Sequence, residues 1–174
     1  MDKRIELYWV EKYPDMFQGY HLTKFQSTMA RGFTCGNGWF YILDGLWKWL
    51  SEFENIIVGQ VKEKFGGLRV YTNLPYAGEK RNQLVNAAIT LSFETCEMCG
   101  AAGERRAGDW LFTLCDSCHG SKDLWAISEE TGIKIVKELG LRTTCESDKD
   151  HILDRFRKSC LCCGAKRVEG KWEV

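Results

Sequence analysis

Two pairs of cysteines are the residues of this sequence whose types and spacing are best suited to chemistry. Cys96 and Cys99 form the first C-x-x-C pair, and Cys115 and Cys118 form the second, with fifteen residues between the pairs. Each pair can make a tight turn that offers two thiolates to one ion, and four thiolates complete the tetrahedral coordination of zinc. The spacing therefore predicts one closed zinc site, which stabilises the fold and leaves no coordination position for a substrate.

A second, incomplete copy of this pattern stands near the end of the chain. Residues 160–165 repeat the C-x-x-C-G-A pattern of residues 96–101, with Cys160 and Cys163 as the paired cysteines. Only eleven residues follow Cys163. The other half of a second zinc knuckle must therefore come from upstream.

The upstream residues best placed to complete this second site are Cys145 and His151. Together with Cys160 and Cys163 they would form a mixed Cys/His set, which is common for zinc. The sequence thus predicts a second zinc ion in the C-terminal segment. In the alternative interpretation, Cys145 and Cys162 are buried thiols and His151 is a solvated helix residue.

The number and grouping of the cysteines favour metal binding over disulfides. Nine cysteines is an odd number, and members of a C-x-x-C pair are poor structural disulfide partners. Residues 1–6 lack the apolar core of a signal peptide, and no run of apolar residues is long enough to span a membrane. We therefore expect a cytoplasmic protein. The isolated Cys35 is predicted to be a buried structural thiol rather than a nucleophile.

One enzymatic alternative rests on the second cysteine pair. Cys115 and Cys118, followed by His119, resemble the closing end of an HNH nuclease finger. Those enzymes place the catalytic histidine between the two pairs, but residues 101–114 contain neither histidine nor asparagine, and His151 lies downstream. The chain shows no other catalytic motif, which favours a non-enzymatic protein.

We expect both helices and strands to position the first site. Apolar residues at helical spacing predict helices over residues 3–13, 39–53 and 78–94. The pattern is clearest in the second of these, where seven residues form the apolar stripe: Trp39, Ile42, Leu43, Leu46, Trp49, Leu50 and Phe53. Core packing is the favoured interpretation of this stripe.

Between the second and third predicted helices, the sequence changes to strand character. Residues 55–64 and 68–72 predict two strands, and Gly66 and Gly67 between them suit a two-residue hairpin turn with positive φ. The resulting order is α-β-β-α, which is typical of an α+β layer in which helices cover a hairpin.

Residues after the cysteine pairs are predicted to form a small, mainly helical module. Residues 124–139 predict one or two helices with Gly140 as the C-terminal cap, and a last helix would run through Lys158. A weaker interpretation makes residues 131–133 the turn of a helix-turn-helix. The predicted divisions are an α+β domain at 1–94, a four-cysteine zinc ribbon at 95–122, and a C-terminal module at 123–174.

Charge bears on the class of partner. The 24 basic and 24 acidic residues balance, so no strong overall field draws the chain to nucleic acid. Basic and aromatic residues nevertheless occur together around the predicted hairpin, as on single-strand-binding surfaces; a solvated surface is the simpler interpretation. These residues are Lys62, Lys64, Phe65, Arg69, Tyr71, Tyr76, Lys80 and Arg81.

Two motifs carry a resemblance to a known family. Residues 35–40 read CGNGWF and residues 61–71 read VKEKFGGLRVY, and the two cysteine pairs follow. This arrangement resembles an uncharacterised family of small phage and bacterial zinc-knuckle proteins with CGDGW and VKEKFGGLR-Y motifs. The resemblance covers roughly residues 30–120 and implies a phage context, but no reaction. The chain departs at Asn37, where the family usually has Asp, which argues against acid chemistry there.

Together these observations favour a non-enzymatic, zinc-stabilised binding protein. The resemblance implies a phage accessory factor in the host cytoplasm that binds a host or defence protein. The balanced charge and the 13% aromatic content suit protein recognition. The alternative is a nucleic-acid-binding zinc protein that modulates transcription or replication. An HNH-like nuclease is the third hypothesis.

Overall fold

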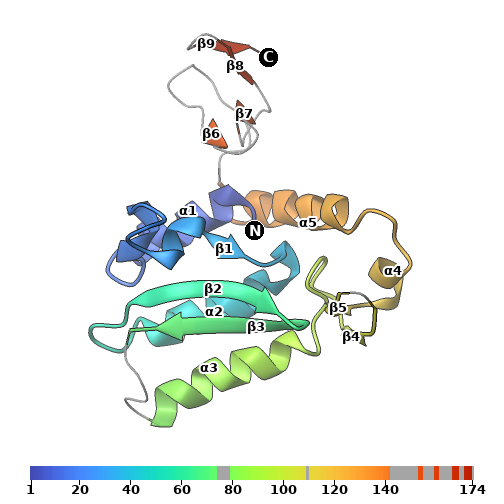
Figure 1. The fold of residues 1–174 in the computed structure, drawn as a ribbon, viewed down its shortest axis with the longest axis horizontal. Coiled ribbons are helices and arrows are strands. Elements are labelled where there is room, and N and C mark those ends of the chain that lie inside the picture. Colours follow the sequence, from blue (N-terminus) through green and yellow to red (C-terminus); the bar gives the residue numbers. More distant parts are fainter. Residues whose placement is uncertain are drawn as a thin grey trace.

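The chain is a mixed helix-and-strand protein in the computed structural model (Figure 1). The structure describes residues 1–73, 79–108 and 110–141, and beyond them the backbone of four short strands at 153–154, 159–160, 166–168 and 171–173. Among the described residues, no helix is both long and apolar enough to cross a membrane.

A three-stranded sheet forms the centre of the fold. Strand β2 (Val58–Lys64) pairs antiparallel with β3 (Gly67–Thr72), as the sequence predicts, and parallel with the short β1 (Phe33–Thr34), which the sequence does not predict. The order is β1-β2-β3. Because β1 has only two residues and pairs with a distant segment, it carries no periodic pattern of its own.

The turn of the β2–β3 hairpin differs from the prediction by one residue. Lys64 pairs with Gly67, so the two turn residues are Phe65 and Gly66, with φ of 59° and 76°. Gly67 belongs to β3, where a Cβ would lie 2.4 Å from ring atoms of Phe93. Gly66 therefore serves the positive φ of the turn, and Gly67 leaves room for an aromatic ring.

Helices pack on the sheet and on one another around one large hydrophobic core. They are α1 (Lys3–Lys12), α2 (Phe40–Leu50), α3 (Glu79–Ser92) and α5 (Leu124–Glu138). Figure 1 shows α2 behind the sheet, and the core cluster joins its apolar side chains to those of β2 and β3. Between α1 and α2 the chain forms three short 3-10 helices: η1 (Gln18–His21), η2 (Thr28–Arg31) and η3 (Asn37–Trp39).

Aromatic rings fill the centre of this core. Trp9 stacks on Phe40 with ring centroids 5.2 Å apart, and Phe17 meets Trp47 edge-on at 5.3 Å. All four rings are buried. Trp47 was not part of the predicted stripe, whereas Trp49, which was, is half-exposed. The buried side of α2 is therefore rotated slightly toward Trp47 and away from Trp49, relative to the predicted stripe.

Helix α5 is one continuous helix, so the helix-turn-helix interpretation of residues 131–133 is wrong. Gly132 lies inside the helix and packs against Asn37. Gly140 ends the helix with φ of 65°, and the N–H groups of Gly140 and Leu141 donate to the carbonyls of Lys137 and Val136. This is the predicted glycine cap.

Residues of α5 join the large core. Ile135 and Val136 belong to the same buried cluster as Trp9 of α1. The described part of residues 123–174 therefore packs in part on the domain predicted at 1–94, whereas the domain boundaries themselves stay a prediction.

The C-terminal strands correct one prediction. Strands β6 (Leu153–Asp154), β7 (Ser159–Cys160), β8 (Lys166–Val168) and β9 (Lys171–Glu173) form an antiparallel sheet in sequence order. The last predicted helix, which would run through Lys158, is wrong at least at Leu153–Asp154. Only three residues, Ile152, Leu153 and Phe156, would form the apolar face of this helix, which is too narrow to hold a helix on a core.

Candidate metal centre

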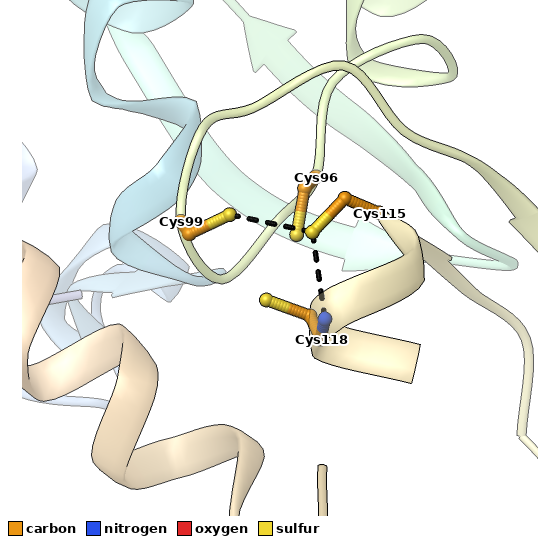
Figure 2. A group of neighbouring side chains, drawn as sticks. All are labelled: Cys96, Cys99, Cys115 and Cys118. Carbon is orange, nitrogen blue, oxygen red and sulfur yellow. Dashed lines mark hydrogen bonds between the residues drawn. The ribbon is translucent and has the colours of Figure 1, made fainter. Parts of the chain in front are cut away.

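Two turns at the ends of one short hairpin bring four cysteines together. Cys96 and Cys99 lie in the loop after α3, whereas Cys115 caps the short helix α4 (Asp116–His119), which contains Cys118. Between the pairs, β4 (Glu104–Arg106) and β5 (Phe112–Leu114) form an antiparallel hairpin. Figure 2 shows the four side chains converging from the loop and from α4.

The spacing of the sulfur atoms suits a single ion. All four lie within 4.8 Å of one another, and those of Cys99 and Cys115 are 3.6 Å apart. Zinc–sulfur bonds of about 2.3 Å in a tetrahedron place the sulfurs about 3.8 Å apart. The four cysteines, hereafter the cysteine cluster, are free thiols that could hold one metal ion.

Backbone hydrogen bonds fix the shape of both turns. The N–H of Cys96 donates to the Ala101 carbonyl at 2.8 Å, and the N–H of Gly100 donates to the Cys96 carbonyl at 2.9 Å. Gly100 has φ of 79°, which L side chains rarely adopt. In the second turn, the N–H of Cys118 donates to the sulfur of Cys115 at 3.4 Å. Both pairs are therefore held ready for an ion by the local backbone.

The thiols of the cysteine cluster influence one another's ionisation. Burial raises the pKa of Cys99, and burial together with the neighbouring thiols raises the pKa of Cys118. Burial also acts to raise the pKa of Cys115, but the N–H of Cys118 and the other thiols bring that pKa below its usual value. Four thiolates this close repel one another, so a cation among them is what lets all four ionise together.

The loop that carries the first pair is hydrogen-bonded to residues 36–39, next to β1. The N–H of Gly36 donates to Oε1 of Glu97, and the N–H of Gly38 donates to the Glu97 carbonyl, both at 2.8 Å. The indole N–H of Trp39 donates to the Thr95 carbonyl at 2.8 Å. The CGNGW motif thus binds the cysteine loop directly.

Two glycines make this close approach sterically feasible. A Cβ at Gly36 would lie 2.3 Å from the carbonyl oxygen of Glu97, and a Cβ at Gly38 would lie 2.3 Å from that of Cys96. Both neighbours are backbone atoms, which cannot rotate away. No side chain fits at either position unless the cysteine loop moves.

Asn37 between these glycines links two further parts of the chain. Its Oδ1 accepts from the N–H of Asp2 at 2.7 Å, and its Nδ2 donates to the Ser128 carbonyl at 2.7 Å. Its own N–H donates to the Ser128 hydroxyl at 3.0 Å. Because the side chain is buried and uses both its donor and its acceptor, Asn37 joins α5 to the start of α1.

The β2–β3 turn also contacts the cysteine region. The Thr113 hydroxyl donates to the Gly66 carbonyl at 2.6 Å, and the Thr113 carbonyl accepts from the N–H of Glu97 at 2.9 Å. Thr113 is completely buried. The two motifs behind the family resemblance, CGNGW and VKEKFGGLR-Y, therefore both lie where the sheet meets the cysteine loop.

Glu97 and Thr113 are site residues that the sequence alone does not reveal. Glu97 is buried between Cys96 and Cys99, and burial raises its pKa to about 7. One of its carboxylate oxygens accepts from the N–H of Gly36, and the other has no hydrogen-bond partner among the residues that the structure describes. No local pattern marks an acid inside a C-x-x-C pair as buried, because its burial depends on the approach of Gly36 from a distant segment.

The other predicted reactive residues are placed as follows. Cys35 is buried, and burial raises the pKa of its thiol to about 12, which agrees with a structural thiol. His119 is exposed and is not part of the cysteine cluster. Cys145, His151 and Cys163 lie outside the described residues. Cys160 ends β7, and its side chain also lies outside the description, so the second site stays a prediction.

Comparison of the chain with known protein families, with curated proteins and with solved structures gave no match. The suspected membership of a phage and bacterial zinc-knuckle family therefore stays a prediction.

Proposed function

We propose that this chain is a non-enzymatic binding protein stabilised by Zn²⁺ at Cys96, Cys99, Cys115 and Cys118. The convergence of four sulfur atoms within 4.8 Å carries the proposal. In this arrangement the β4–β5 hairpin and the two cysteine turns make a zinc ribbon. Four thiolates fill a tetrahedral site, so the ion would have a structural role and would leave no position for a substrate or an activated water.

The donor set supports zinc over the common hard cations. Thiolates are soft ligands, whereas Mg²⁺ and Ca²⁺ prefer oxygen. Iron can also be held by four cysteines, so a metal analysis should measure iron as well as zinc. The burial of Cys96 and Cys118 also fits a structural ion that is shielded from solvent.

The ion would fasten the ribbon to the sheet. The loop of the first cysteine pair accepts hydrogen bonds from Gly38 and Trp39, and β5 contacts the hairpin turn through Thr113. Without an ion, mutual repulsion and desolvation oppose the ionisation of all four cysteines in this arrangement. Metal binding in the ribbon and the order of residues 36–39 should therefore depend on each other.

Metal removal tests this role. Treatment with a zinc chelator should lower the melting temperature by roughly 10 °C or more, because structural zinc contributes to folding free energy. Calorimetry measures the change, and added Zn²⁺, but not Mg²⁺, should restore the original value. An unchanged melt, with metal analysis proving that the ion has been removed, would rule out a stabilising zinc ribbon.

A second zinc ion at Cys145, His151, Cys160 and Cys163 forms part of the proposal. Its support is that Cys160 ends β7 and Lys166 begins β8, so the C-x-x-C pair leads from one antiparallel strand into the next. Cys160→Ser should lower the zinc content by one ion per chain. Elemental analysis that finds the same content would remove Cys160 from the ligand set.

Two classes of partner fit such a protein. A phage accessory factor that binds a host or defence protein is what the family resemblance implies, and this stays a prediction. Nucleic acid is the alternative, and one specific feature of the structure favours it, namely the exposed face of the β2–β3 hairpin.

A further inference from the structure

The two faces of the β2–β3 hairpin differ in character. Val61 pairs with Val70, and both side chains pack with the large core. Because side chains alternate along a strand, the neighbouring pairs lie on the opposite face. This outer face carries five side chains: Gln60, Lys62, Lys64, Arg69 and Tyr71.

No helix covers the outer face among the described elements. Helix α2 lies behind the sheet in Figure 1, on the side of the core, and the face turned toward the viewer has no labelled element in front of it. Lys64 and Tyr71 are exposed, and Lys62 is partly exposed. The outer face is therefore open to a partner.

Cations and aromatic rings alternate across this face. Nζ of Lys62 lies 5.3 Å from the centroid of the Tyr71 ring, and Nζ of Lys64 lies 5.1 Å from that of Phe65. At the other edge, the Phe93 ring lies over Gly67, and two guanidinium groups approach it at 5.9 Å and 5.6 Å. These groups belong to Arg69 and Arg105.

The positive charge of this surface is not cancelled locally. Within the described residues, no ion pair with an acidic side chain is formed by the three cations of the outer face or by the adjacent cation of β4. These cations are Lys62, Lys64, Arg69 and Arg105. Glu63 also belongs to β2, but its side chain points to the face opposite that of Lys62, because side chains alternate along a strand. Its carboxylate accepts from the N–H of Gly66 at the turn. A chain of zero net charge thus gathers cations on one face, which favours a polyanion as the partner.

The backbone at Phe65 adds an independent observation. Phe65 has φ of 59°, a conformation that is unfavourable for a bulky residue and that asparagine or glycine would adopt more easily. Burial does not compensate for this strain, because Phe65 is 60% exposed. Tyr71 is also exposed, at 46%. A strained, exposed ring beside a cation is better explained by binding than by folding.

We propose that the outer face of the β2–β3 hairpin binds single-stranded nucleic acid. The cations contact phosphates, and unpaired bases stack on the Phe65 and Tyr71 rings. A duplex hides the faces of its bases, and protein interfaces are usually depleted of charge at their centre, so both fit this surface less well. The inference names the partner of the binding protein proposed above and so rests on that function.

The test is fluorescence anisotropy with labelled 20-mers of dT and rU and with a DNA duplex, at several salt concentrations. The folded wild-type protein should bind at least one single strand more tightly than the duplex. Four phosphate contacts predict a slope of log K against log salt of about −3. The DNA and RNA arms show which strand the surface prefers.

Variants locate the binding. Tyr71→Ala should weaken it about 5- to 100-fold through lost stacking, and Lys62→Gln with Lys64→Gln should reduce the salt slope by about 1.4. The matched controls lie on other surfaces. Trp49→Ala removes a ring of similar exposure, and Lys48→Gln with Lys122→Gln removes two exposed cations. Both controls should bind as the wild type does.

Three outcomes would overturn the inference. The first is no binding by the wild type, and the second is tighter binding to the duplex than to either single strand. The third is binding that Tyr71→Ala does not weaken and that heparin abolishes by competition, which would indicate a surface for acidic proteins. Zinc content and melting temperature are measured on the same samples. Failure of strand binding in a zinc-loaded, folded protein therefore leaves the zinc ribbon intact, whereas a zinc-free preparation counts against the ribbon.

Discussion

At the scale of single residues, two glycines and one asparagine hold the cysteine loop next to the sheet. Gly36 and Gly38 let two backbone segments approach to hydrogen-bonding distance, and Asn37 joins the same point to α5 and α1. Asparagine suits this position better than aspartate would, because Nδ2 donates to the Ser128 carbonyl. An aspartate carboxylate there would face that carbonyl without a donor.

Gly38→Ala tests the close approach. A Cβ there would meet the Cys96 carbonyl oxygen at 2.3 Å, so the loop must move, and we expect the free energy of unfolding to fall by about 3 kcal/mol. Chemical denaturation measures the change.

Gly45→Ala is the matched control for this substitution. Apart from the neighbouring backbone of α2 itself, no described atom lies within 4 Å of the new Cβ, and Gly45 is exposed. The alanine should therefore stabilise the helix by about 0.5–1 kcal/mol. Equal effects of the two substitutions would contradict the close approach at Gly38.

At the scale of elements, the sequence predicts what has a local pattern. The helix at α2, the two strands of the hairpin, the helix at α3 and the glycine cap at Gly140 follow from periodicity and turn chemistry. The convergence of the four cysteines follows from their spacing. Each of these features is encoded within a short stretch of chain.

What the sequence does not predict depends on contacts between distant segments. Strand β1 has two residues, and only its pairing with β2 makes it a strand. Burial of Glu97 and Thr113 comes from Gly36 and Gly66, which lie 61 and 47 residues away. The predicted last helix was wrong at Leu153–Asp154, because three apolar positions are too few to distinguish a helix from short strands.

The hairpin turn gives a prediction at this scale. Phe65→Asn should raise the free energy of unfolding by about 1 kcal/mol, because asparagine tolerates positive φ better than phenylalanine does. The same variant should bind single strands more weakly, since it removes a ring of the outer face. Chemical denaturation measures the first effect and fluorescence anisotropy the second. A variant that is less stable than the wild type and binds single strands equally tightly would contradict the role assigned to this turn.

At the scale of the whole molecule, one ion would hold together parts that are distant in sequence. The loop of Cys96 and Cys99 contacts residues 36–39, and β5 contacts the hairpin turn. Asn37 extends the connection to α1 and α5. The outer face of the hairpin begins at that same turn. Loss of zinc should therefore disturb strand binding as well as stability.

The zinc ion at the cysteine cluster underlies these expectations, and elemental analysis of protein purified without added metal is its most direct test. We predict at least one zinc and no iron per wild-type chain, one zinc fewer in Cys118→Ser, and no loss in Cys35→Ala, whose thiol lies in the large core. A folded wild-type chain without zinc, or a Cys118→Ser variant with the full zinc content, would show that the cysteine cluster holds no zinc.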